Sequence, residues 1–214
     1  TTKRTMRTKT LVLTAAFGLA GAASSMAQVY SVNAVGYINL DIQPGFQIVA
    51  NQLDDGDGNR LVNLIPAPPE GTLCYKFNPE TGLYNTSVFG FGVWSVPDMA
   101  LNPGEGAFLR NTTDAAFTVT FVGEVPQGTL EVDLPEGFSI ASSVVPQAGD
   151  LSMMDFPSAE GDVIYFYQND SGLYENAVFG FGAWSPAPMV EVGEGVFVKK
   201  AADATWTREF SVND

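Results

Sequence analysis

The stretch GLYNTSVFGFGVWS occupies residues 82–95, and GLYENAVFGFGAWS occupies residues 172–185. Ten of these fourteen positions are identical, at a spacing of ninety residues. Self-similarity at a fixed spacing is the sign of a duplicated structural unit. The sequence therefore predicts two tandem modules of ~90 residues each, residues 35–125 and residues 126–214.

The repeat continues outward from this stretch with small changes of spacing. Three further pairs of segments match: Pro44-Gly45-Phe46 with Glu136-Gly137-Phe138, Gly104-Glu105-Gly106 with Gly193-Glu194-Gly195, and Phe117–Phe121 with Trp206–Phe210. Only residues 125–128 join the two units, and so short a linker predicts closely coupled modules. Two separate cores and one pseudo-symmetric sandwich both agree with this pattern.

Hydrophobic alternation indicates β-structure throughout. In residues 37–42, Ile38, Leu40 and Ile42 alternate with Asn39 and Asp41, which is typical of a strand with one solvated face. Further strands are expected at 46–50, 73–77, 83–91, 107–110 and 117–122 and at their second-copy equivalents. The predicted fold is all-β, with sandwich-like or barrel-like modules and at most one short helical turn in each.

Each expected helical turn has a candidate N-terminal cap followed by a proline. Asn59 precedes Pro66 and Asp150 precedes Pro157, with six residues between cap and proline in both copies. Asn and Asp are favoured N-caps, and proline ends a helix. We therefore expect Asn59 and Asp150 to cap these turns.

Composition excludes several classes of chemistry. The 214 residues contain no histidine and one cysteine, which removes histidine-based catalysis, thiolate zinc sites and internal disulfides. The lone Cys74 aligns with Ile164, so it is expected to be a core residue. Hydrophobic residues make up 45% of the chain, enough to form a core.

The first 27 residues have the pattern of a secretory signal peptide. Four basic residues precede an apolar run, residues 11–23, and Ala27 ends a small-residue cleavage motif. Cleavage leaves a 28–34 extended segment before the first module, and 6 basic against 24 acidic residues, a formal charge of −18. We expect no nucleic-acid partner and no membrane span in the mature chain.

Aromatic residues of the repeated stretch are candidates for ligand binding. On a single strand, Phe89 and Phe91 would share one face, while Gly90, Gly92 and Trp94 would share the other. Glycines beside an aromatic residue can leave a flat platform for a sugar ring, or the same Trp can cover them within the core. The candidate ligand-binding residues are Trp94, Trp184, Tyr84 and Tyr174.

An acidic loop makes calcium the one candidate cofactor. Asp54, Asp55, Asp57 and Asn59 lie close in sequence, and the last three occupy the first, third and fifth positions of a calcium-loop pattern. Arg60 and Pro66 stand where that pattern requires glycine and glutamate. A calcium site of another type and a solvated turn both remain open.

Each module also has one glutamate between two glycines. If the modules faced each other, Glu105 and Glu194 could form the carboxylate pair that glycoside hydrolysis requires. A tight turn accounts equally well for the glycines. No other catalytic motif is present in the sequence.

Several segments together resemble a known family. The segments are Val32-Asn33-Ala34-Val35-Gly36-Tyr37, Pro44-Gly45-Phe46, Asn51-Gln52-Leu53-Asp54 and Pro103-Gly104-Glu105-Gly106. They resemble a family of uncharacterised, secreted tandem-repeat β proteins from environmental Gram-negative bacteria, over nearly the whole mature chain. The resemblance implies an envelope or extracellular location and no particular activity.

The sequence thus predicts a non-catalytic exported β-repeat protein, a structural, adhesive or matrix component of the cell surface or extracellular space. The periplasm is the alternative location. Its expected partners are other copies of itself, other envelope or matrix proteins, or a polysaccharide. The alternative functions are carbohydrate binding at Trp94 and Trp184, and glycan cleavage by Glu105 and Glu194.

Overall fold

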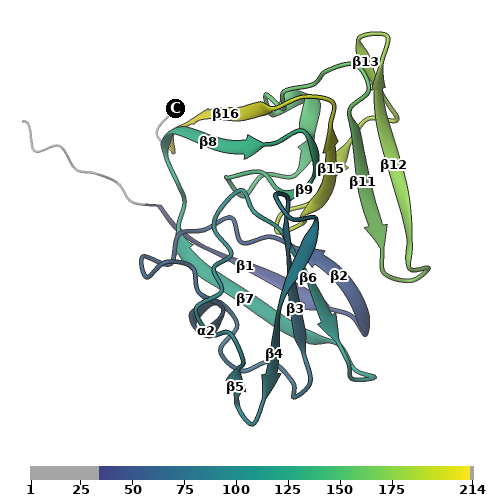
Figure 1. The fold of residues 1–214 in the computed structure, drawn as a ribbon. Coiled ribbons are helices and arrows are strands. Elements are labelled where there is room, and N and C mark those ends of the chain that lie inside the picture. The colour runs from purple at the N-terminus through teal and green to yellow at the C-terminus, as the bar shows by residue number, and fades with distance from the viewer. Residues whose placement is uncertain (1–33, 213–214) are drawn as a thin grey trace, which may run out of the picture. The chain divides into compact units, whose positions relative to one another are not determined.

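The computed structural model describes residues 34–212, which are nearly all β (Figure 1). The expected signal peptide, 1–27, and the 28–34 segment except its last residue lie outside these residues. Within them, the helical pieces are α2 (Leu61–Leu64) and one 3-10 turn (Leu151–Met153). Neither has the length that a membrane crossing requires.

The first half of the chain forms a two-stranded ribbon and a five-stranded antiparallel sheet. The ribbon pairs β1 (Val35–Ile42) with β7 (Phe117–Glu124). In spatial order, the sheet contains β2 (Gly45–Val49), β6 (Ala107–Asn111), β3 (Leu73–Asn78), β4 (Leu83–Gly90) and β5 (Val93–Trp94).

The second half repeats this topology. Its ribbon pairs β8 (Gly128–Leu134) with β16 (Ala204–Phe210). Its sheet contains, in the equivalent order, β9 (Gly137–Ala141), β15 (Val196–Lys200), β11 (Val163–Gln168), β12 (Leu173–Gly180) and β13 (Ala183–Ser185). An additional short pair joins β10 (Gly149–Asp150) to β14 (Met189–Val190).

Each ribbon packs on its own sheet and encloses a hydrophobic cluster. In the first half the ribbon residues Ile42 and Phe121 belong to one buried cluster with Cys74 and Leu109 of the sheet. In the second half Trp206, Ile164 and Val198 belong to another. A third, smaller cluster contains Ile48, Phe108 and Ile140, which come from both halves. Residues 34–212 nevertheless lie in one compact unit.

The expected match of Phe117–Phe121 with Trp206–Phe210 is two residues out of register. Pairing places Val119 opposite Leu40 in the first ribbon and Trp206 opposite Val132 in the second. Leu40 and Val132 are themselves equivalent, so Trp206 corresponds to Val119. The reason is that five residues separate β6 from β7 while three separate β15 from β16.

The expected strand at 83–91 is one residue too long. Strand β4 ends at Gly90, and Phe91 and Gly92 form the turn to β5 with φ values of 55° and 77°. Positive φ at both central residues is the signature of the tight hairpin turn whose twist matches the flanking strands. Phe89 therefore pairs with Trp94 across the hairpin.

One expected helix cap is confirmed and the other is wrong. The Asp150 carboxylate accepts a hydrogen bond from Ser152 N at the start of the 3-10 turn. Helix α2 begins after Arg60, which makes no side-chain capping bond. Asn59 instead adopts φ 51° and accepts the Asp55 N–H through Oδ1, because the acidic loop folds back on it.

The two Gly-Glu-Gly turns meet where the halves join. A Cβ atom on Gly106 would lie 2.6 Å from Ile140 Cγ2 and 3.4 Å from Gly195 Cα. A Cβ atom on Gly195 would lie 2.8 Å from Ile48 Cγ2 and 3.3 Å from Gly106 Cα. These contacts are reciprocal, as in a two-fold interface, where the same surface of each partner is used.

The first glycine of each turn also packs closely against the opposite half. A Cβ atom on Gly104 would lie 2.5 Å from Val132 Cγ2 of the second ribbon. One on Gly193 would lie 2.6 Å from Leu40 Cδ2 of the first ribbon. The Ser142 N–H donates to Gly104 O, and the Ala50 N–H donates to Gly193 O. Each turn thus packs on the opposite half.

Replacing Gly106 with alanine should destabilise the protein, because the new methyl group would clash with Ile140. We expect the free energy of unfolding in urea to fall by about 1–3 kcal/mol, the usual cost of overpacking. Gly90→Ala is the control, since its Cβ would come no nearer than 3.9 Å to a neighbour. Equal losses in the two variants would contradict the role given to this close approach.

Candidate functional site

The sheets present aromatic residues on the face opposite each core. In β3, Cys74 points into the first core, while Tyr75 and Phe77 alternate with it and lie on the other face, partly buried. Strand β11 repeats this arrangement, with Ile164 in the second core and Tyr167 on the other face. Strands β3 and β11 therefore carry apolar side chains on both faces, as strands that are covered on both sides do.

Rings from the two halves contact one another on this second face. Phe108 and Tyr167 have ring centroids 5.2 Å apart, and Phe77 and Phe197 have centroids 5.3 Å apart, both edge to face. Phe108 and Phe197, which are equivalent in the repeat, lie 6.1 Å apart. Such geometries are the preferred ones for aromatic pairs.

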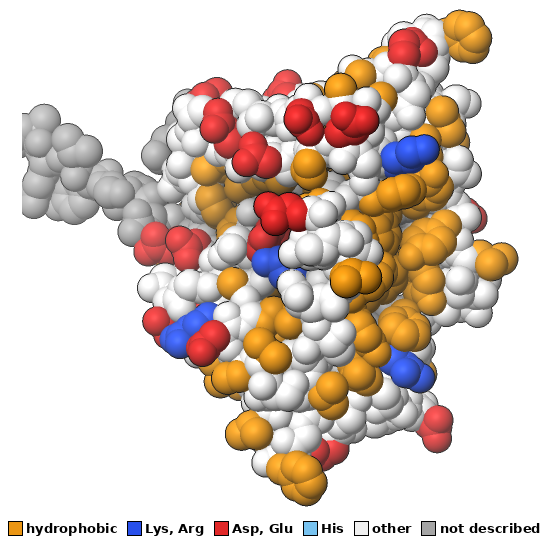
Figure 2. Space-filling view, in the orientation of Figure 1, with side chains coloured by type: hydrophobic (Ala, Val, Ile, Leu, Met, Phe, Trp, Pro, Cys, Tyr) orange, Lys and Arg blue, Asp and Glu red, His pale blue; other side chains and the backbone are white. Residues whose placement is uncertain are grey.

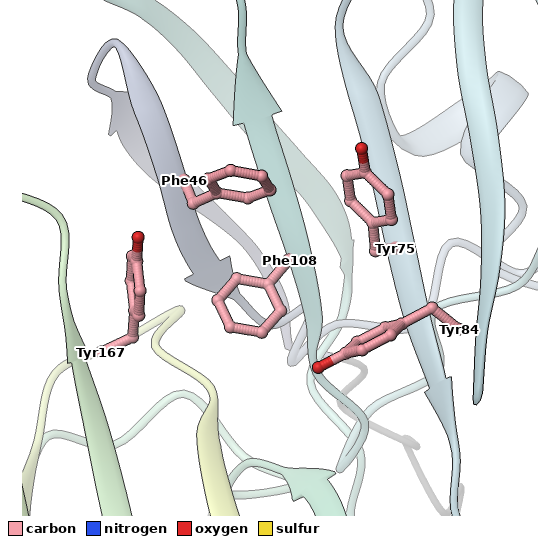
Figure 3. A pocket seen from close by; sticks show the side chains of 5 residues that line it. All are labelled: Phe46, Tyr75, Tyr84, Phe108 and Tyr167. Carbon is pink, nitrogen blue, oxygen red and sulfur yellow. The ribbon is translucent and has the colours of Figure 1, made fainter. Parts of the chain in front are cut away.

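A first cleft opens beside these contacts (Figure 3). Its volume is about 360 Å³, and it is lined by Phe46, Tyr75, Tyr84, Phe108 and Tyr167. In Figure 3, Tyr167 of β11 stands on one side of Phe46 and Phe108, and Tyr75 and Tyr84 stand on the other. The first half thus supplies four rings and the second half supplies one.

A second cleft is the repeat equivalent of the first. Its volume is about 530 Å³. Transferring the residues of the first cleft through the repeat gives Phe138, Tyr165, Tyr174, Phe197 and Phe77, and all five line the second cleft, together with Gly82 and Tyr84. Tyr84 thus lines both clefts, and each cleft contains rings from both halves.

The clefts lie along one hydrophobic band (Figure 2). Hydrophobic side chains gather where β3, β4 and β6 meet the second half, and basic side chains lie near both ends of this band. Arg110 Cζ is 5.0 Å from the ring centroid of Phe46, and Lys199 Nζ is 5.8 Å from that of Phe138. Arg110 and Lys199 are equivalent in the repeat, so each cleft has one cation at its rim.

These two cations differ from the other basic residues of the described chain. Of the six basic side chains in residues 34–212, four form ion pairs, namely Arg60, Lys76, Lys200 and Arg208. Arg110 and Lys199 are exposed and form none. The two cations of residues 34–212 that form no ion pair therefore lie beside the two clefts, where an anionic group on a ligand would meet them.

Two of the cleft hydroxyls, those of Tyr84 and Tyr174, have raised pKa values. Partial burial raises the pKa of Tyr84 above its usual value. Burial, with the neighbouring Tyr84 and Tyr167, raises the pKa of Tyr174 to about 12. These groups act as hydrogen-bonding phenols rather than as bases.

The residues predicted to bind ligand lie in two different environments. Tyr84 and Tyr174 line the clefts and are 42% and 45% exposed. Trp94 is 3% exposed, packs on Phe89, and donates its indole N–H to Ile65 O at 2.7 Å. Trp184 is partly buried and donates to Ser158 Oγ. An indole buried like that of Trp94 offers no open face to a sugar ring, because core packing covers it.

The acidic loop is internally bonded. Asp57 Oδ2 accepts hydrogen bonds from Arg60 Nη2 at 2.6 Å and from Asn63 Nδ2 at 2.9 Å, and these two residues hold the pKa of Asp57 below its usual value. Asp54 and Asp55 accept backbone N–H groups of the loop. In residues 34–212, no group of three or more acidic, His or Cys side chains is arranged to hold a metal ion. The structure therefore adds no support to the calcium prediction.

The two candidate carboxylates have partners in their own halves. Glu105 Oε2 pairs with Lys76 Nζ at 2.8 Å and accepts the Asn102 N–H. Glu194 Oε2 accepts the Glu191 N–H at 2.8 Å. Burial raises the pKa of Glu194 above its usual value. The position equivalent to Lys76 is Phe166, so the second half offers Glu194 no corresponding cation.

Cys74 occupies the core position that its alignment predicts. It is 2% exposed and belongs to the first hydrophobic cluster. Burial raises the pKa of its thiol to about 12, against a smaller opposite effect of Lys76. A thiol in this state is not a nucleophile at neutral pH.

Most cleft residues were not identified from the sequence. The missed set comprises Phe46, Tyr75, Phe77, Phe108, Phe138, Tyr165, Tyr167, Phe197, Arg110 and Lys199. A signal for them was present, since each of these positions is aromatic or basic in both copies. This signal is hard to recognise in strands whose two faces are both apolar, because alternation along the strand does not distinguish a face in the core from a face in a cleft.

No protein-family model, no curated protein and no solved structure matches this chain. The resemblance to secreted tandem-repeat β proteins therefore stays a prediction, and the geometry of the clefts is the main evidence on function.

Replacing Glu105 and Glu194 by neutral glutamine should change the stability of the folded protein in opposite directions. A raised pKa in the folded state means that native stability falls as pH rises through it. Glu194→Gln should therefore raise the urea midpoint at pH 7, and the gain should vanish near pH 3.5, below the usual glutamate pKa of about 4.3. Glu105→Gln loses the Lys76 pair and should lower stability at pH 7 by up to about 1 kcal/mol. Changes of the same sign at pH 7 would contradict the assigned environments.

Proposed function

We propose that this chain is a non-catalytic, exported protein made of two tandem copies of one β module. It acts as a structural, adhesive or matrix component at the cell surface or in the extracellular space, with the periplasm as the alternative location. Its two aromatic clefts hold apolar groups of its partners. The pattern of residues 1–27 supports export, and the repeated topology supports the two-module description.

One observation carries the proposal: the duplication places the same aromatic cleft on the chain twice, each with an unpaired cation at its rim. The residues that line the clefts are aromatic, apart from one glycine, and burial raises the pKa of the Tyr84 and Tyr174 hydroxyls among them. No carboxylate, amine or thiol stands among them. An apolar cleft with one charged group at its rim is suited to binding.

The chemistry of the clefts defines the class of ligand group. Aromatic walls favour a flat apolar group, which can pack edge to face against the rings. Arg110 and Lys199 favour a negative charge next to that group, because each lies over an aromatic ring and neither forms an ion pair within residues 34–212. The best fit is therefore an aromatic or apolar group adjacent to an anionic group.

Two dyes that differ by one charge test this proposal. The probes are 8-anilinonaphthalene-1-sulfonate and its neutral analogue N-phenyl-1-naphthylamine, titrated into dilute protein and followed by fluorescence. Tyr84→Ala with Tyr174→Ala removes a wall from both clefts and should weaken both dyes by about tenfold or more. Arg110→Gln with Lys199→Gln should weaken only the sulfonate, by up to about fivefold, which is the value of one exposed ion pair.

Tyr37→Thr is the matched control, because Tyr37 is an exposed aromatic residue, 74% exposed, on β1. It should leave both affinities unchanged. Unchanged affinities in both sets of cleft variants would refute the binding role of the clefts.

Carbohydrate binding is the second candidate, and the placement of Tyr84 and Tyr174 favours it. Tyrosine rings can stack on the apolar face of a sugar, and their neutral hydroxyls can bond its hydroxyl groups. Soluble glycans that displace the neutral dye from the clefts would support this candidate. Glycans that leave the dye bound would remove it.

A further inference from the structure

Each half displays one phenylalanine at the tip of a hairpin. Phe91 lies in the turn between β4 and β5, and Phe181 lies in the turn between β12 and β13. Both side chains are fully exposed. Phe91 and Phe181 are named here the phenylalanine tips.

The tips are unfavourable for the isolated molecule in two respects. Their φ values are 55° and 54°, in the left-handed region, where glycine or asparagine is usual and phenylalanine is rare. Their rings also leave apolar surface in water. Since the folded chain gains no packing from these rings, their presence in both copies points to a contact outside the molecule.

A carboxylate fixes each tip. Glu70 accepts the N–H groups of Phe91 and Gly92, both at 2.8 Å. Glu160 accepts those of Phe181 and Gly182 at 3.0 and 2.8 Å. Each ring therefore projects from a turn held by two charge-assisted hydrogen bonds, and the carboxylate that accepts them binds the backbone of the same residue.

We propose that the aromatic clefts of one molecule receive the phenylalanine tips of another copy of this chain. This inference rests on the proposed function and names the partner of its clefts. A tip presents an aromatic ring next to a carboxylate. A cleft presents aromatic walls with Arg110 or Lys199 at its rim. The ring of a tip would therefore contact aromatic walls, and the carboxylate next to it would lie near a cation.

The arrangement predicts assembly by tip-to-cleft contacts. Tip and cleft are different surfaces of one chain, so one-way contacts produce rings or continuing filaments, whereas two copies that exchange tips form a closed pair. Two tips and two clefts on each copy allow more than two neighbours. Repulsion between acidic chains is limited at physiological ionic strength, because charges farther apart than about 8 Å are screened.

A lipid surface is the other occupant that an exposed phenylalanine suggests. The carboxylates of Glu70 and Glu160 stand next to the rings, and the protein as a whole is strongly acidic. Anionic headgroups would repel both features. The observations therefore favour a second copy, and vesicle binding is a distinct outcome of the test.

Sedimentation velocity over a range of protein concentrations tests the inference at about 0.15 M NaCl. The wild type should show a weight-average mass that rises with concentration above that of a monomer. Phe91→Asn with Phe181→Asn should remain monomeric at every concentration. Because asparagine tolerates positive φ, this double variant should also unfold at a higher temperature than the wild type, which separates lost assembly from lost folding.

Further variants identify the surface that receives the tips. Arg110→Gln with Lys199→Gln should weaken association about fivefold per contact at most, whereas Tyr37→Thr should associate like the wild type. A monomeric wild type, or a tip variant that assembles as the wild type does, overturns the inference. So does sedimentation of the wild type, but not of the tip variant, with vesicles of neutral and anionic phospholipid in the absence of self-association.

Failure of this inference can be distinguished from failure of the proposed function. The tip variant keeps both clefts and should bind both dyes with wild-type affinity. Dye binding that depends on Tyr84 and Tyr174, combined with a monomeric wild type, would leave the clefts as binding sites and remove only the second copy as their occupant.

Discussion

The close approach of Gly106 and Gly195 is the constraint on which the rest of the structure depends. Their α-carbons can come together only because neither residue has a side chain. Phe108 and Phe197 follow two residues later on β6 and β15, so this approach brings their rings into contact. The clefts form on either side of those rings, and a larger residue in either turn would separate their walls.

Comparison of the two halves separates what the duplication retained from what it changed. The internal polar contacts differ: Lys200 is buried and bonds to Asp162 and to Pro157 O in the second half, whereas its equivalent Asn111 donates to Ile42 O and Ala115 O in the first. The cleft rings, the rim cations, the phenylalanine tips and their carboxylates are present twice. Of these repeated features, the tips and the rim cations are exposed, which is consistent with a role in contacts between molecules.

Prediction from the sequence succeeded where one residue type has one structural meaning. Alternation located the strands, and Asp150 was identified correctly as a cap because its carboxylate has few other uses beside a helical turn. It failed where two partners compete. Asn59 bonds to its own loop instead of capping α2, and Phe91 lies in a turn that favours glycine or asparagine. Trp206 occupies the position equivalent to Val119, because the connection from β15 to β16 is two residues shorter than the connection from β6 to β7.

The sequence by itself determined that this chain contains a stretch that recurs ninety residues later, is rich in β-structure, carries an excess of acidic residues and has no histidine, because those properties follow from residue identity and local period. Only the tertiary structure decided which aromatic residues are core and which form clefts. Trp94 and Tyr84 lie on the same hairpin, yet one indole is buried against Phe89 while the other ring is open to solvent. That difference arises from packing between strands and between halves, and such contacts join residues that are far apart along the chain.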